Sequence, residues 1–289
     1  MPQIALLLTT LIWGATFPAT KAVLEQIPPL SFLFLRFLIG ALCSLLMLAL
    51  VRHGVQGDGN TLTRSAVATV WLFLGYVLQT VGLQYTSASN SAFVTALYVI
   101  FVPLFLGRFH LRIWLSAALA LVGLWCLINP TVFLNLGDVL TLGCAMAFAA
   151  HIACLESYSR EGDPRSFFVW QFILMTSILL PALWLESPRS GAFAPTGLLA
   201  VGLIVTGVFA TGAFAVQVWA QRLVPAQRVA LIFSLEPAYA AWLSWYFLGE
   251  QMNARGLLGS AIILAAVVIG AIAPDVDKMA ESVGSPAAS

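Results

Sequence analysis

A glutamate within a long apolar stretch is the residue of this sequence best placed to do chemistry. Glu236 lies about ten residues into the apolar stretch 226–248 and is followed by Pro237. A charge at the centre of a bilayer costs roughly 2.5–3.5 kcal/mol, so such a group faces protein or a water-filled cavity. Because proline lacks an N–H and clashes with the preceding turn, we expect a kink. Glu236 is therefore either a site for a proton or a substrate amine, or a carboxylate that bonds the backbone freed at the kink.

An aromatic residue followed three positions later by a glutamine recurs at matching places in the two halves of the chain. Tyr76 and Gln79 are three residues apart and share one face of a helix. An offset of 138 residues makes Phe214 and Gln217 their counterparts. Neutral amides suit zwitterions or polar neutral solutes, because they orient a solute without selecting one sign of charge. The glutamines either line a pseudo-symmetric cavity or join helices by hydrogen bonds.

Aromatic side chains and one histidine complete the candidate site. Trp13 and Phe17 share a face of the first apolar stretch. At an offset of 135 residues, Phe148 is the counterpart of Trp13 in the second half of the chain. Tyr98 offers a hydroxyl group and an apolar ring to a cavity wall. His151 can carry a proton near neutral pH. The alternatives are ordinary packing for the aromatic residues and a buried, hydrogen-bonded histidine.

Four further polar residues lie closer to the ends of the apolar stretches. At the offset of 135, Lys21 aligns with Glu156 and Arg36 with Gln171. Side chains there can snorkel to the interface or bridge helices.

The chain contains none of the common short motifs of enzymes or ATP-driven pumps. Gly-x-x-x-x-Gly-Lys-Ser/Thr, His-Glu-x-x-His, Gly-x-Ser-x-Gly and Cys-x-x-Cys are all missing from its 289 residues. The formal net charge of +1 gives no indication of a nucleic-acid partner. We therefore expect no catalytic site, no metal, no cofactor and no nucleic acid.

The elements that position these residues are membrane-spanning helices. The chain is 61% hydrophobic and 9% charged, whereas soluble proteins carry about 25% charged residues. A span needs roughly 20 apolar residues, and only helices satisfy their own backbone in lipid without closing a barrel. The sequence predicts an all-α membrane protein with ten transmembrane helices, near 3–24, 30–51, 66–86, 88–107, 111–128, 137–157, 166–185, 197–220, 226–248 and 254–273.

Basic residues in the loops predict the orientation. With the N-terminus inside, nine Lys or Arg residues fall in cytoplasmic segments and three in outer segments, as the positive-inside rule requires. We expect a multi-pass membrane protein with both termini cytoplasmic. Residues 274–289 are predicted to form a disordered cytoplasmic tail.

The two halves of the chain resemble each other. Three segment pairs match in the same order: 29–37 with 164–172, 78–92 with 216–230, and 106–121 with 248–263. Residues 1–130 and 131–273 would thus be repeats of five helices each. Because five is odd, the repeats must be inverted, which is the arrangement of secondary transporters with alternating access.

Four segments resemble a known family. They are LIWGATFPATKAV (11–23), PLSFLFLRFLIGAL (29–42), TSASNSAFVTALYVIFVPL (86–104) and FSLEPAYAAWLSWYFLGEQMN (233–253). They are similar to the drug/metabolite transporter superfamily, and best to its EamA-type ten-helix exporters, among them the YddG-like amino-acid exporters. The resemblance implies export of amino acids or related small metabolites across the inner membrane of a bacterium. We expect the protein to be a monomer. LGRFHL (106–111) and Phe148 depart from the family pattern, and the second departure bears on the substrate pocket.

Two other functions stay open on sequence grounds. One is a nucleotide-sugar or organic-phosphate exchanger of the same superfamily, which would want basic residues in its cavity. Only Lys21, Arg36 and Arg228 are near, and none is central. The other is an integral-membrane enzyme, for which no reactive constellation is visible. The sequence does not decide between proton-coupled and facilitative transport.

Overall fold

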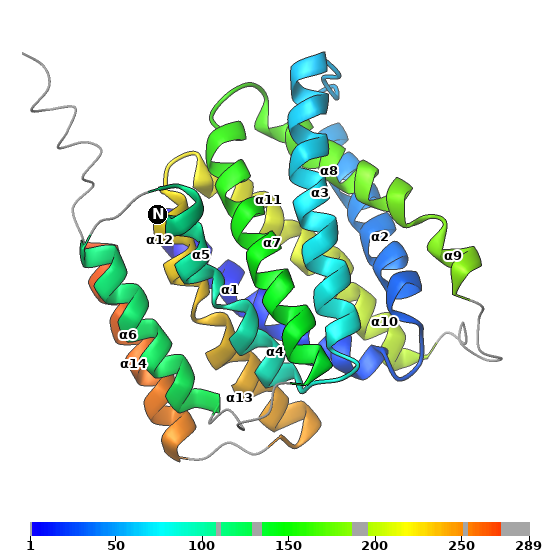
Figure 1. The fold of residues 1–289 in the computed structure, drawn as a ribbon. Coiled ribbons are helices and arrows are strands. Elements are labelled where there is room, and N and C mark those ends of the chain that lie inside the picture. The colour runs from blue at the N-terminus through cyan, green and yellow to red at the C-terminus, as the bar shows by residue number, and fades with distance from the viewer. Residues whose placement is uncertain (1, 108–110, 129–134, 187–195, 251–253, 273–289) are drawn as a thin grey trace, which may run out of the picture.

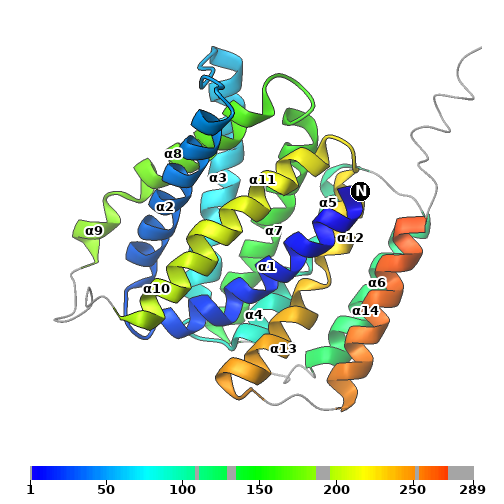
Figure 2. The same cartoon turned by 180° about the vertical axis from the view of Figure 1, so that it is seen from behind.

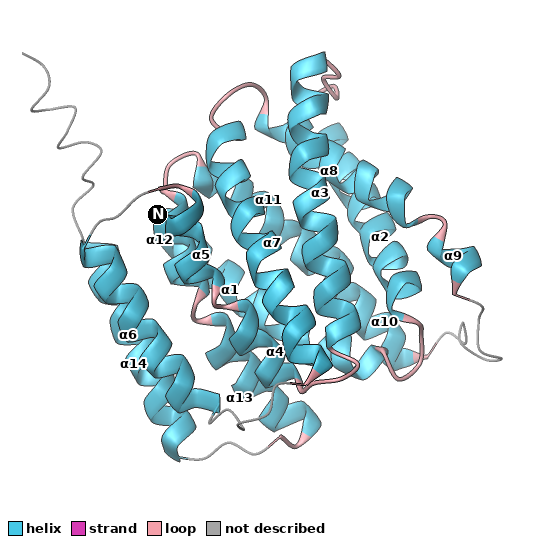
Figure 3. Cartoon of the chain, viewed as in Figure 1, coloured by secondary structure: helices cyan, strands magenta, loops and turns pink. Residues whose placement is uncertain are grey.

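The fold of the chain is helical throughout the part that is described. The computed structural model describes residues 2–107, 111–128, 135–186, 196–250 and 254–272. These residues form helices and loops, and no strand occurs among them (Figure 3). The predicted tail, 274–289, lies outside the described residues.

Helices occupy all ten predicted spans. Six are uninterrupted: α1 (Pro2–Val23), α2 (Pro29–Leu50), α3 (Gly59–Gly82), α6 (Leu111–Ile128), α7 (Leu136–Tyr158) and α14 (Ala254–Ile272). Four are interrupted: α4 (Ala88–Thr95) with α5 (Tyr98–Phe105), α8 (Pro164–Leu179) with α9 (Ala182–Leu185), α10 (Gly197–Leu203) with η1 (Ile204–Phe209) and α11 (Ala210–Gln221), and α12 (Ala226–Phe233) with α13 (Glu236–Leu248). The segment η1 is a π-helix.

Length and apolarity qualify seven of these helical stretches as membrane spans within the described residues. The uninterrupted apolar parts of α6 and α14 are shorter, Ile113–Cys126 and Leu257–Ala266. The stretch formed by α12 and α13 is not among the seven. Its break at the centre and its polar residues are consistent with a helix that lines the interior.

The helices form one bundle with a pair standing to one side. α3 packs against α7, α2 against α8, and α1 against α11 and α13. α6 and α14 lie side by side at the edge of the bundle and pack chiefly against each other (Figures 1 and 2). α1 crosses the back of the bundle next to α11, α12 and α13 (Figure 2).

A glycine permits one of these crossings, between α1 and α13. A Cβ atom on Gly14 of α1 would lie 2.7 Å from the Cβ of Tyr239 and 3.0 Å from the carbonyl oxygen of Glu236. Both distances are too short for a side chain at position 14. The absence of a side chain therefore lets α1 lie directly against α13.

Two polar side chains tie helices to neighbouring loops at opposite ends of the bundle. Nζ of Lys21 on α1 donates to the carbonyl oxygens of Leu83 (2.6 Å) and Thr86 (2.9 Å), between α3 and α4. The carboxylate of Glu156 on α7 accepts from the backbone N–H of Ala226 (3.1 Å), the first residue of α12, directly after the loop that follows α11. These residues bridge helices, one of the two roles that the sequence allowed.

A cluster around Asp163 joins the loop after α2 to the start of α8. Its carboxylate accepts from the backbone N–H (3.0 Å) and hydroxyl (2.6 Å) of Ser166 and lies 2.8 Å from Nε2 of His53. Partial burial disfavours the charged carboxylate, but the hydrogen bonds from Ser166 and His53 outweigh it, so the pKa of Asp163 lies below its ordinary value. The carboxylate thus caps α8 in its ionised form.

We expect Asp163→Ala to lower the stability of the protein by about 1 kcal/mol at pH 7, the usual worth of a helix N-cap. A lowered folded-state pKa means that the charged form adds stability above the unfolded-state pKa of about 3.9, and this is lost as pH falls. In detergent, the unfolding temperature of Asp163→Ala should therefore lie below that of the wild type at pH 7, and this difference should shrink below pH 4. Glu25→Gln, which changes an exposed glutamate between α1 and α2, is the control; a difference independent of pH would contradict the assignment.

Candidate functional site

A small cavity of about 30 Å³ lies inside the bundle. Its walls come from α1, α3, α5, α7, α11, α12 and α13, which belong to six of the ten spans. The lining residues are Trp13, Thr16, Phe17, Leu72, Gln79, Tyr98, Phe148, His151, Ile152, Gln217, Phe233 and Glu236. Residues from both halves of the chain therefore face one space.

Eight of the ten residues proposed from the sequence lie on this cavity: Trp13, Phe17, Gln79, Tyr98, Phe148, His151, Gln217 and Glu236. Tyr76 and Phe214 lie one layer behind them. The ring of Tyr76 is 6.5 Å from that of Trp13 and 5.2 Å from that of Phe148. The ring of Phe214 is 6.2 Å from that of Trp13. These two residues support the wall and do not form its surface.

Two broken helices position the most polar part of the cavity. α12 ends at Phe233 and α13 begins at Glu236, so the predicted kink is confirmed as a break. α4 ends at Thr95 and α5 begins at Tyr98, which is the same break 138 residues earlier. Each break places the first residue of its second helix on the cavity.

Glu236 is 3% exposed, and it is the only acidic or basic residue, histidine aside, among those that line the cavity. Within the described part of the chain, no hydrogen bond links its carboxylate to the backbone freed at the break. The structure therefore does not support the capping alternative. The Tyr98 hydroxyl lies near this carboxylate, but its geometry falls short of an ordinary hydrogen bond.

Three further polar atoms at the cavity have no partner among the described residues. They are Nε1 of Trp13, the hydroxyl of Tyr98 and Oε1 of Gln217. A buried polar group left unpaired costs about 1–3 kcal/mol. The residues that line the cavity thus include one unpaired donor, one unpaired hydroxyl and one unpaired acceptor in addition to the Glu236 carboxylate.

The remaining polar groups near the cavity are already paired. Nε2 of His151 lies 2.9 Å from Oε1 of Gln171, and its ring stacks on Phe214 at 5.5 Å. This favours the hydrogen-bonded histidine over a free proton carrier. The Nε of Gln79 donates to the Thr95 hydroxyl at 3.3 Å. Within the described ranges, no group of His, Cys, Asp and Glu side chains could hold a metal ion.

Arg36 and Gln171 are buried and bridge helices, which is one of the two roles that the sequence allowed. Their exposed fractions are 4% and 0%. Nη2 of Arg36 donates to the hydroxyl of Tyr76 at 3.1 Å, and its guanidinium lies 4.3 Å from the centre of that ring. Because each finds a partner on a neighbouring helix, neither needs to snorkel.

Sequence reasoning did not select four residues that line the cavity: Thr16, Leu72, Ile152 and Phe233. Spacing gave a signal for three of them. Thr16 is adjacent to Phe17, Leu72 is one turn before Tyr76, and Ile152 is one turn after Phe148. For Phe233 the signal was its place just before the kink.

The sequence profile of the EamA-like transporter family matches residues 1–129 and, a second time, residues 135–271. The chain belongs to the EamA-like transporter family. Its relatives include an uncharacterized transporter of Archaeoglobus fulgidus, which is 33% identical over 92% of this chain and 84% of the relative. Another is the uncharacterized transporter YwfM of Bacillus subtilis, 25% identical over 96% of this chain and 95% of the relative.

A solved structure supports the fold of this EamA-family transporter. A crystal structure with 16% sequence identity superposes with a TM-score of 0.75, covering 94% of this chain and 98% of that one. At this identity the likeness concerns the fold alone. The chain is thus a multi-pass membrane transporter of a small molecule and not an enzyme.

Proposed function

We propose that this transporter exports amino acids or closely related small metabolites from the cytoplasm by alternating access. Two inverted repeats of five helices, residues 1–130 and 131–273, would rock around the cavity in a monomer. The proposed location is the inner membrane of a bacterium, with both termini cytoplasmic. The bias of basic residues among the loops supports this orientation.

The paired helix breaks support alternating access. The breaks after Thr95 and Phe233 are 138 residues apart, the same offset that relates the second pair of similar segments in the two halves. Discontinuous helices at the interface of two repeats commonly form the substrate site of secondary transporters. The cavity lies where these breaks occur.

The observation that carries the proposed substrate class is the chemistry of the cavity wall. A single carboxylate, Glu236, can receive an ammonium group, while Trp13 and Tyr98 offer donors for a carboxylate. The surrounding aromatic rings suit varied side chains. Among the described lining residues none is Lys or Arg, so an anionic cargo such as a nucleotide sugar is not favoured.

A flux assay tests the proposal. We expect purified protein in liposomes to release labelled amino acids faster than empty liposomes, and to release N-acetylated derivatives more slowly, because acetylation removes the ammonium group. The panel should include neutral, aromatic and charged amino acids and one nucleotide sugar. No flux above empty liposomes for any amino acid, or flux of the nucleotide sugar alone, would refute it.

A further inference from the structure

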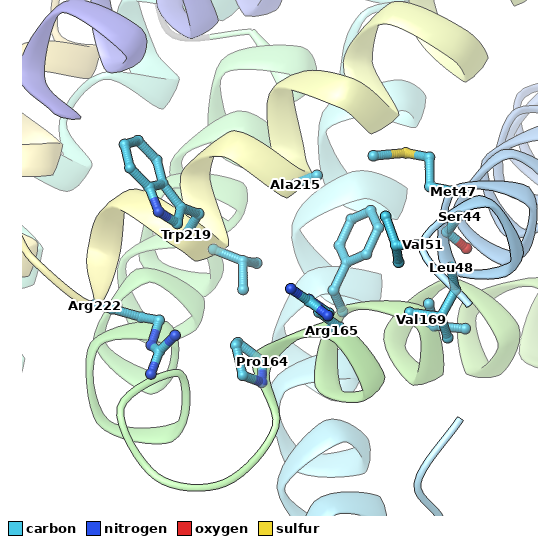
Figure 4. A pocket seen from close by; sticks show the side chains of 12 residues that line it. Ser44, Met47, Leu48, Val51, Pro164, Arg165, Val169, Ala215, Trp219 and Arg222 are labelled. Atoms are coloured by element: carbon cyan, nitrogen blue, oxygen red, sulfur yellow. The ribbon is translucent and has the colours of Figure 1, made fainter. Parts of the chain in front are cut away.

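A second, larger cleft lies at one end of the bundle, between the end of α2, the start of α8 and the end of α11 (Figure 4). It has a volume of about 270 Å³ and shares no lining residue with the transport cavity. Phe168 lines the cleft and its ring lies 5.7 Å from that of Phe214, which supports the cavity wall. Aromatic side chains therefore separate the two spaces.

The cleft is apolar along most of its length. On α11 its lining residues run from Ala215 to Arg222, and on α2 from Ser44 to Val51. Seven residues of helix span about 10 Å. The apolar lining residues are Met47, Leu48, Val51, Phe168, Val169, Ala215, Val218 and Trp219. The slot thus extends about two helical turns from the ends of the helices toward the interior of the bilayer.

Two arginines lie at the mouth of this slot. Arg165 is in the first turn of α8 and Arg222 follows the last residue of α11. In Figure 4 their side chains lie on either side of Pro164. Both are exposed, and within the described residues neither guanidinium has a carboxylate partner.

Two other arginines at the same end of the bundle, Arg64 and Arg160, are paired. Arg64 lies 2.5 Å from the carboxylate of Glu161, and Arg160 lies 3.3 Å from that of Glu156. The pair at the cleft differs from these two in keeping unneutralised charges, and both of its members line the apolar slot.

We propose that this cleft binds one anionic phospholipid, with the phosphate between Arg165 and Arg222 and an acyl chain in the slot. The charge at the mouth fits a phosphate and the apolar walls fit a hydrocarbon chain. The helix ends place the arginines at the level of the headgroups, where basic residues attract anionic lipids. A soluble anion would leave the slot unfilled, and a zwitterionic lipid would not match two positive charges.

Native mass spectrometry of the full-length protein in detergent tests the proposal, with dioleoyl phosphatidylglycerol and dioleoyl phosphatidylcholine as probes. We expect tighter binding of phosphatidylglycerol, and a loss of roughly 30-fold in the double variant Arg165→Gln with Arg222→Gln. The double variant Arg52→Gln with Arg64→Gln removes the same charge at the same end of the bundle outside the cleft, and should bind like the wild type. Because all four arginines are on the surface, these variants should fold.

Two further arms identify the occupant. Ala215→Phe narrows the slot and should weaken both lipids without changing the preference between them. Glycerol 1-phosphate carries the headgroup chemistry without acyl chains and should not displace phosphatidylglycerol at equal concentration. Displacement by glycerol 1-phosphate, equal binding of the two lipids to the wild type, or equal losses in the two double variants would each overturn the proposal.

Discussion

Replacing Glu236 with glutamine is expected to slow amino-acid efflux from liposomes at least about 10-fold, the worth of one hydrogen bond to a charged group. The change keeps the size of the side chain and removes the one carboxylate on the cavity wall. It should also reduce discrimination against N-acetylated amino acids, since a neutral amide does not select for an ammonium group. The measurement is the initial efflux rate of each amino acid and of its acetylated derivative.

A matched control separates this effect from a general effect of charge. Glu25→Gln changes an exposed glutamate between α1 and α2, away from the cavity. It should leave efflux and discrimination unchanged. If Glu236→Gln exported amino acids at the wild-type rate with unchanged discrimination, the assignment of Glu236 to the ammonium group would be wrong. The unfolding temperature of each variant in detergent shows whether it is folded.

Replacing Gly14 with leucine is expected to destabilise the protein by about 3 kcal/mol and to abolish transport. Overpacked side chains typically cost 1–3 kcal/mol, occasionally more, and here the nearest atoms include the backbone oxygen of Glu236 at 3.0 Å. α1 would have to move away from α13, which would separate Trp13 from Glu236. Size-exclusion chromatography and thermal unfolding in detergent measure the loss of stability.

Gly212 on α11 provides the control for this substitution. It is also inside a helix, but no heavy atom lies within 4 Å of the position that its Cβ would occupy. Gly212→Leu should therefore express and transport like the wild type. Equal effects of the two leucines would mean that the contact between α1 and α13 has no special importance.

The sequence predicts the spans well because each is a long apolar stretch bounded by polar residues. The second span was expected at 30–51 and α2 runs from Pro29 to Leu50. Internal breaks are harder. Pro237 predicts the break before α13. The break before α5 falls at Ala96 and Leu97, which are ordinary helix formers and give no such signal. Only its position, 138 residues before the break at α13, could have predicted it.

The candidate site was predictable where polar or aromatic residues stand out against an apolar background. Trp13, Gln79 and Glu236 are of this kind, and all three lie on the cavity. Leu72 and Phe233 are not, because in a membrane helix an apolar side chain is equally suited to face lipid, protein or a cavity. For such residues the packing of the other helices decides, and a single sequence does not contain it.

The separate position of α6 and α14 has a practical consequence for experiments. The pair contributes no described residue to the proposed transport cavity, and its outer face carries exposed side chains such as Leu115 and Leu264. Spectroscopic labels attached there would provide a reference position next to the proposed transport cavity but outside its wall. Changes in the distance from such labels to labels on α1 or α8 would then measure any movement of these two helices relative to α6 and α14.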